Sequence, residues 1–537
     1  MGRMRRLGLM RRIWEGSLAR LDEPRIRLLR PIGLMHGTPL MNTFAFSLLL
    51  ALTTVSAFAG FRVEPYLQNP TDTEISVLWF SDTEKPGTLS LGTGEKYTST
   101  PVLAGALAYH DAERAAGLVP ESLSTPWLHR IRLKGLEPGR EYAYSVFQGG
   151  QTRSGTLHTA SGTGVMLAVF ADSETEPESA GEHRKWPAPG AEPNRLYPAD
   201  QNQGFAANLA VIAEQKPDLL LIAGDLVESG NEQRDWDEFW WQLAGGMGRL
   251  ASNTVILPAL GNHENYGGPH GGGGYSLATA LAAVDRYKTY FEVPVAAGIP
   301  KRFQERFYRL DYGPVTVVTV DSSNGLPEGS ERDSNWYLNA TDAEGVVRIP
   351  DFNPGSAQYR WLEEQLKAAS ESAAFIFVQF HHMPYSGGVH GKIPGADTQS
   401  GYPLRVLTPL FVKYGVDAVF CGHCETYEHW LVDGVHFYDI GIGGDGLRPS
   451  LPDLGKTPGI QRVFSAYGDQ WEIVIDGKTV PGGLHYGHLL VDVTPLEEGG
   501  WRAVLTPRVV VPILDDSGDV TSWKVFEYPD RVELRSG

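Results

Sequence analysis

The segment VILPALGNHE, residues 255–264, joins an uninterrupted apolar run to a group of polar side chains of the kinds that bind ions. The run at residues 255–260 is short and aliphatic, which is typical of a strand buried on both faces. The sequence Gly-Asn-His-Glu follows it at residues 261–264. This segment therefore predicts a buried strand with functional side chains at its carboxyl end.

The same pattern recurs on both sides of this segment. Apolar runs occur at residues 165–170, 219–223, 315–320, 375–380 and 418–421. They lead into polar side chains: Asp172, Asp225, Asp321, the pair His381 and His382, and His423. Helical patterns at residues 233–243 and 357–369 lie between some of the runs. This alternation predicts a layered α/β domain.

In open α/β sheets, ligands bind beyond the carboxyl ends of the strands. A single Asp at a strand end is most often a turn or cap residue. Five of these six runs lead, in order, into Asp172, Asp225, Asn262 with His263, the pair His381 and His382, and His423, and so many metal-ligand types point instead to a shared ion site.

The regions before and after the α/β alternation are predicted to be β-structure. Residues 60–160 contain short alternating runs separated by turn signals, which predicts a small sandwich domain. The catalytic part is expected to span residues 164–537 and to end in β-segments at 486–493, 501–511 and 521–528. A separate small C-terminal domain is the alternative for those last segments.

Composition limits the function. The 537 residues carry a net charge of −18 and only two cysteines, so neither a disulfide framework nor a non-specific nucleic-acid binder is expected. Residues 1–40 hold nine arginines and three acids. An apolar stretch at 44–58 and the sequence Ala57-Phe58-Ala59 then indicate a signal peptide within residues 1–59, with a membrane anchor as the alternative. The mature protein is expected to be secreted or periplasmic, to start near Gly60 and to lack a membrane span.

A two-metal hydrolytic site needs a bridging carboxylate, terminal oxygen and nitrogen ligands, and an open position. The strand ends supply these ligand types in Asp172, Asp225, Asn262, His381 and His423.

Five ordered blocks carry a family resemblance. They are Asp172-Ser173-Glu174, Gly224-Asp225-Leu226-Val227-Glu228, Gly261-Asn262-His263-Glu264, His381-His382-Met383-Pro384 and Gly422-His423-Cys424-Glu425. With Pro65-Tyr66-Leu67-Gln68 near the start, the chain resembles the calcineurin-like metallophosphoesterases, and within them the purple acid phosphatase branch. The resemblance implies a four-layer αββα sandwich preceded by an all-β fibronectin III-like sandwich.

The resemblance also implies a role for each matching residue. Asp225 would bridge two metal ions, and Asp172 would bind the first. Ligands of the second would be Asn262, His381 and His423, with His382 as an alternative to His381.

Three further residues would act on the substrate. His263 would contact the phosphoryl group or protonate the leaving oxygen, and Glu264 would orient it. His390 resembles a substrate-facing histidine, although a solvated loop histidine is an equal alternative.

Three positions depart from the family pattern. Glu425 stands where the last block normally ends in His, Glu174 where many relatives have His, and Glu228 where a Tyr is usual. The first site would then hold only oxygen ligands, which favours Mg²⁺, Mn²⁺, Ca²⁺ or Fe³⁺, whereas the second suits Zn²⁺, Mn²⁺ or Fe²⁺.

The expected function is hydrolysis of a small phosphorylated substrate by a phosphomonoesterase with two metal ions. A phosphodiesterase would use the same site. A secreted binding protein with a degenerate metal site is the alternative from another class.

Overall fold

The apolar runs that follow residue 164 form two sets of parallel strands. The first set is β9 (Val165–Phe170), β12 (Leu219–Ile222) and β13 (Val255–Pro258), and the second is β15 (Val315–Thr319), β16 (Phe375–His382) and β17 (Ala418–Gly422). β12 pairs in parallel with both β9 and β13, and β16 with both β15 and β17. Their carboxyl ends therefore meet at one edge of each sheet.

The computed structural model of the chain describes residues 60–117, 119–160, 162–177, 185–186, 195–196, 201–246, 249–444, 459–466, 473–475, 478–480, 486–514 and 520–536. The predicted leader and signal peptide, residues 1–59, lie outside the described residues. Within the part that is described, no helix is both long and apolar enough to cross a membrane.

The predicted C-terminal β-segments extend the first sheet. β23 (Tyr486–Pro495) pairs antiparallel with β9 and with β24 (Trp501–Leu514), which in turn pairs with β25 (Val520–Glu527) and β26 (Val532–Ser536). The second sheet has the order β14–β15–β16–β17–β19–β18–β20. Its remaining strands are β14 (Tyr308–Tyr312), β18 (Tyr427–Val432), β19 (Val435–Ile440) and β20 (Ile460–Ser465).

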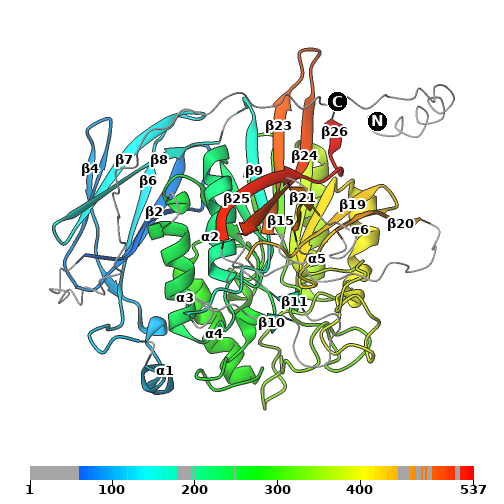
Figure 1. The fold of residues 1–537 in the computed structure, drawn as a ribbon, viewed down its shortest axis with the longest axis horizontal. Helices are drawn as coiled ribbons and strands as arrows, with labels where there is room; N and C mark the ends of the chain where they lie inside the picture. Colours follow the sequence, from blue (N-terminus) through cyan, green and yellow to red (C-terminus); the bar gives the residue numbers. More distant parts are fainter. Residues whose placement is uncertain are drawn as a thin grey trace, which may run out of the picture. The chain divides into compact units, whose positions relative to one another are not determined.

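The two sheets face each other between helices, which gives the αββα order (Figure 1). β9 contacts β17, and β23 contacts β19, so one hydrophobic core lies between the sheets. α2 (Gln201–Gln215) packs on β23 and β24. α5 (Ala357–Ser372) packs on β15, β16 and α6 (Thr408–Tyr414), over a second core that includes Trp361 and Phe411. The expected four-layer α/β fold is confirmed.

Residues 60–160 form two antiparallel sheets, as predicted for a sandwich. One contains β1 (Phe61–Gln68), β2 (Glu74–Ser81), β6 (Trp127–Lys134) and β5 (Val102–Leu103). The other contains β4 (Lys96–Thr98), β3 (Thr88–Leu91), β7 (Glu141–Gln148) and β8 (Gln151–His158).

The first sandwich sheet continues directly into the catalytic sheet. Leu67 of β1 pairs in parallel with Val255 of β13, so the ten-strand path runs from β25 to β5 without a break. The Gln68 side-chain amide donates to the Ile256 carbonyl at 3.1 Å. The sequence did not predict this shared sheet, because the pairing joins segments nearly two hundred residues apart.

A tryptophan-rich helix supports this junction. α3 (Gln233–Trp240) buries Trp236 and Trp240, and the Trp240 ring lies 4.2 Å from that of Tyr66. Both rings therefore lie in the hydrophobic core at this junction. Trp241, which begins the π-helical turn after α3, is 54 % exposed.

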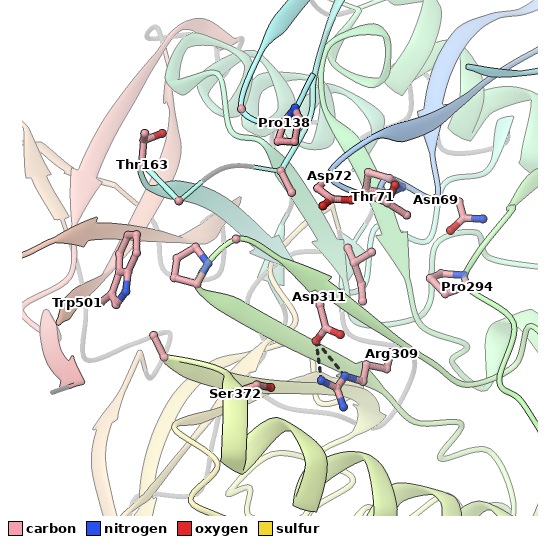
Figure 2. Close-up of a pocket in the computed structure, with 18 residues that line it drawn as sticks. Asn69, Thr71, Asp72, Pro138, Thr163, Pro294, Arg309, Asp311, Ser372 and Trp501 are labelled. Carbon is pink, nitrogen blue, oxygen red and sulfur yellow. Dashed lines mark hydrogen bonds and ion pairs between the residues drawn. The ribbon is translucent and has the colours of Figure 1, made fainter. Parts of the chain in front are cut away.

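A cavity of about 980 Å³ lies at the amino ends of the central strands (Figure 2). Thr163 before β9, Pro314 before β15 and Ala374 before β16 line it, and the Arg309–Asp311 ion pair at 2.9 Å forms part of its wall. It therefore opens at the edge opposite the predicted ion site.

His129 allows a stability prediction. Its two ring nitrogens each hydrogen-bond a serine hydroxyl, Ser81 Oγ and Ser99 Oγ, at 2.8 Å, and the ring stacks on Trp79. Burial lowers the pKa of His129 to about 4. Since the unfolded state binds the proton more tightly, the contribution of His129 to stability is full only well above pH 6.5 and falls as the pH drops toward 4, with a loss of about 2 kcal/mol at pH 5.

This loss is measured by chemical unfolding of the chelator-treated protein at pH 7 and pH 5. His129→Gln is expected to be less stable at pH 7 but to lose less between the two values. An equal loss in both proteins would contradict the prediction.

Candidate metal centre

Four electron-pair donors converge at the carboxyl ends of β12, β13, β16 and β17. His381 Nε2 lies 2.8 Å from Asp225 Oδ2, 2.9 Å from Asn262 Oδ1 and 3.1 Å from His423 Nδ1. All four side chains are buried. The tertiary structure thus brings together the predicted ligands of the second metal.

Backbone carbonyls determine which ring nitrogens face this point. His381 Nδ1 donates to the Ala223 carbonyl at 3.0 Å, and His423 Nε2 donates to the Gln399 carbonyl at 2.6 Å. The other nitrogen of each ring is then left with its lone pair. Such carbonyl partners are the usual way in which proteins orient metal-binding histidines. Lone pairs directed at one point repel each other unless a cation lies between them, so this donor set fits a metal ion.

A second group of ligand types shares Asp225. Glu174, Asp225 and His263 each present a donor atom within 4.8 Å of the others, just as Asp225, His381 and His423 do. One carboxylate common to two groups is what a bridging ligand requires.

Asp172, which follows β9, lies next to these two groups. Its carboxylate is fully buried and accepts from the His423 backbone amide at 2.8 Å. Burial, together with the nearby carboxylates of Asp225 and Glu174, raises the pKa of Asp172 well above its usual range. A cation would offset this repulsion.

The backbone at the site is conformationally strained. Five non-glycine residues there have positive φ angles: Asp172 (57°), Glu174 (40°), Asp225 (51°), His423 (77°) and Glu425 (49°). This region is unfavourable for L-residues other than glycine, and such strain concentrates at functional sites. No β-propensity or helical period in the sequence signals these angles.

Glu264 contacts the backbone rather than an imidazole. Its carboxylate accepts from the amides of Gly261 at 2.7 Å, Leu226 at 2.8 Å and Asp225 at 2.9 Å. None of its hydrogen bonds to described residues goes to His263. The orienting role of Glu264 stays a prediction, and these contacts indicate that it would act through the loop that carries His263 and not through its ring.

His263 is oriented by another group. Its Nδ1 donates to the Glu228 carbonyl at 2.6 Å, and its Nε2 lies 3.7 Å from the Glu174 carboxylate. Burial disfavours the charged ring, but the carboxylates of Asp225, Glu174 and Glu228 outweigh it and raise the pKa of His263 well above its usual value.

The other predicted residues lie around these groups. His382 Nδ1 bonds Ser322 Oγ at 2.9 Å, so His381, and not its neighbour, faces Asp225 and Asn262. The His390 ring stacks 4.2 Å from that of His423 and pairs with Asp397 at 3.2 Å.

Two acidic candidates are less central. Glu228 is 33 % exposed, with its carboxylate 3.9 Å from His263 Nδ1. Glu425 is buried. Neither belongs to the two groups of converging donors. Cys421 and Cys424 are buried free thiols.

Two residues from distant loops, Gln399 and Tyr275, also contact the site. Gln399 holds His423 through its carbonyl and donates through its side chain to the Tyr275 hydroxyl at 3.0 Å. Tyr275 also accepts from Asn262 Nδ2 at 3.5 Å. Neither follows an apolar run, so no pattern pointed to them.

Comparisons with known proteins agree with this architecture. Residues 183–424 match the calcineurin-like phosphoesterase model, and residues 61–161 match the purple acid phosphatase N-terminal domain. An uncharacterized protein of Mycobacterium tuberculosis is 28 % identical over 66 % of this chain and 59 % of its own length. An acid phosphatase of Aspergillus ficuum is 26 % identical over 42 % of this chain and 41 % of its own length.

Solved structures show the same fold. The purple acid phosphatase PPD1 of yellow lupin (Lupinus luteus) has a TM-score of 0.55 at 17 % identity, over 86 % of this chain and 74 % of its own. PhoD has a TM-score of 0.55 at 14 % identity, over 89 % and 91 %.

The chain therefore carries a calcineurin-like phosphoesterase domain preceded by a purple acid phosphatase N-terminal domain. It spans about three fifths or less of the length of the mycobacterial and fungal relatives. The phosphoesterase match includes Asp225, Asn262, His381 and His423 but begins after Glu174 and ends before Glu425. The departures from the family pattern thus fall mainly outside it.

Glu264→Gln tests the positioning role. The amide can accept through only one oxygen and turns its NH₂ toward backbone donors, so we expect a loss of about 2–3 kcal/mol in unfolding free energy. Metal content, measured by mass spectrometry of the purified protein, should fall with it. Exposed Glu364→Gln is the control. Unchanged stability and metal content with a selective fall in kcat would contradict this role.

Proposed function

We propose that this chain is a metal-dependent phosphomonoesterase. The observation that carries the proposal is the convergence of His381 Nε2, Asp225 Oδ2, Asn262 Oδ1 and His423 Nδ1 on one point, with Asp225 shared by the Glu174 and His263 group. In this proposal Asp225 would bridge two ions, and Asp172 and Glu174 would supply oxygen ligands to the first. Bound ions would polarise the phosphoryl oxygens and lower the pKa of water.

The residues of the chain would position the substrate and hold the proton. Because Nδ1 of His263 is committed to the Glu228 carbonyl, Nε2 is the atom available to the leaving group. The surrounding carboxylates favour the protonated ring, which can donate to a leaving alkoxide. Gln399 and Tyr275 would keep the Asn262 and His423 side chains in place.

Parallel turnover of p-nitrophenyl phosphate and bis(p-nitrophenyl) phosphate tests the proposal across Mn²⁺, Mg²⁺, Zn²⁺ and iron. Faster hydrolysis of the monoester is expected. Faster hydrolysis of the diester would indicate a phosphodiesterase on the same site. Absence of both activities and of bound metal would favour a binding protein, and an Arabidopsis thaliana relative, 23 % identical, is named a probable inactive purple acid phosphatase.

We also propose that the chain is exported, with cleavage after Ala59. The support is the apolar stretch at residues 44–58 and the Ala57-Phe58-Ala59 sequence. N-terminal sequencing of the protein recovered outside the cytoplasm should begin at Gly60.

Asp225→Asn is expected to reduce monoester turnover by at least 10³-fold, a loss of about 4 kcal/mol in transition-state stabilisation. Replacing one bridging oxygen by an amide removes a negative charge that both ions would share. Metal content and kcat/KM should fall together, while circular dichroism stays unchanged. Near-normal turnover in the folded variant would refute the site assignment.

His263→Ala is expected to slow turnover by about 10²–10⁴-fold, the range typical of a lost general acid. Metal content should not change, because in this proposal Asp172, Glu174 and Asp225 would hold the first ion and the four converging donors the second, so that His263 binds neither. The loss should be smaller for p-nitrophenyl phosphate than for an alkyl phosphate, because the nitrophenolate leaves without a proton. Equal losses for both substrates would argue against acid catalysis.

A further inference from the structure

A second cavity, of about 670 Å³, lies beside α4 (Leu277–Tyr290), away from the metal ligands. It is lined by five cationic side chains and two carboxylates: Lys288, Lys301, Arg302, Arg306 and Arg348, with Asp285 and Glu305. The chain as a whole has a net charge of −18. The lining is therefore opposite in sign to the chain as a whole.

Two of the cations make no direct contact with a carboxylate in the described part of the chain. The ammonium groups of Lys288 and Lys301 form no hydrogen bond or ion pair with the part of the chain that the structure describes. Burial and the Arg306 charge lower the pKa of Lys288 to about 8, against the opposing effect of Glu305 and Asp285. Maintaining these positive charges together costs free energy, and an anion in the hollow would offset that cost.

The floor of the cavity is a rigid, buried guanidinium. Arg306 is 1 % exposed and pairs with Asp321 at 2.5 Å. Its Nη2 also donates to Asn265 Oδ1 at 3.3 Å. Asn265 Nδ2 in turn donates to the Gly261 carbonyl at 2.9 Å, at the start of the loop that carries Asn262 and His263.

We propose that this hollow is an anion site for a diphosphate-class ligand, connected to the metal-binding loop through Arg306 and Asn265. Its volume exceeds what a single phosphate fills, and the Lys288 and Lys301 ammonium groups would each contact one phosphate of a diphosphate. The arginines add positive charge nearby, although Arg306 pairs with Asp321 and Arg348 with Asp342. The site is separate from the metal centre and does not depend on the proposed hydrolysis.

Calorimetric titration of the intact, metal-loaded protein with methylenediphosphonate tests the proposal, because its P–C–P bridge is not hydrolysed. The parent should bind one equivalent of methylenediphosphonate in this cavity. The double variant Lys288→Gln, Lys301→Gln should bind that equivalent at least tenfold more weakly. Lys96→Gln, Lys367→Gln removes the same charge from exposed positions and should bind like the parent. Any ligand bound at the metal centre is common to all three proteins.

Hydrogen exchange reports the connection to the loop. Peptides covering residues 261–266 should gain protection on titration in the parent and in the Lys96, Lys367 control, and gain less in the Lys288, Lys301 variant. A parallel titration with α,β-methylene adenosine diphosphate distinguishes two sources of the diphosphate group. A nucleotide site would bind this analogue more tightly than methylenediphosphonate, whereas a site for inorganic diphosphate would bind the two equally. Equal weakening in both double variants, or a binding curve reproduced by chloride at the same ionic strength, would overturn the site.

Discussion

The Glu264 carboxyl group accepts hydrogen bonds from four backbone amides that belong to two different strand ends. Three of these amides follow β12 and one follows β13, so a single buried side chain joins the turns that carry Asp225 and Asn262. Gly261 permits this approach, because a Cβ there would lie 2.0 Å from Asp225 Oδ1. The position of the shared carboxylate, and with it both groups of ligand types, depends on this connection.

Bringing several carboxylates and lone pairs together in a buried site lowers the free energy of unfolding. This unfavourable contribution has more than one source. Burial of Asp172 near Asp225 and Glu174 disfavours ionisation, while the two histidines nearest Asp225 lower the pKa of Asp225 to about 2 despite its burial. Five positive φ angles add backbone strain at the same place. The two rigid sheets supply the compensation, because their strands are buried on both faces and their cores are continuous.

Much of the fold was predictable because buried parallel strands produce uninterrupted apolar runs. Every such run became a strand, and residues 357–369 became most of α5. The errors occurred where a property depends on distant segments. β16 continues through His382, so that His381 and His382 both lie within the strand, where His381 Nε2 faces Asp225 and His382 Nδ1 bonds Ser322 Oγ. Trp240 and Trp241 are adjacent residues of the same type, yet Trp240 is buried and Trp241, at the start of the π-helical turn, is exposed.

The sequence by itself determined the α/β class, the N-terminal sandwich and the types of side chain at the strand ends, because these follow from local periodicity and residue chemistry. Only the tertiary structure decided which atoms meet. The ring nitrogens that face the site are fixed by the carbonyls of Ala223 and Gln399, and Glu264 binds amides rather than His263. The junction of β1 with β13 and the cationic hollow floored by Arg306 likewise join residues far apart in the chain. Hydrogen bonds and charge interactions act over a few ångströms in space, and sequence separation carries no record of that distance.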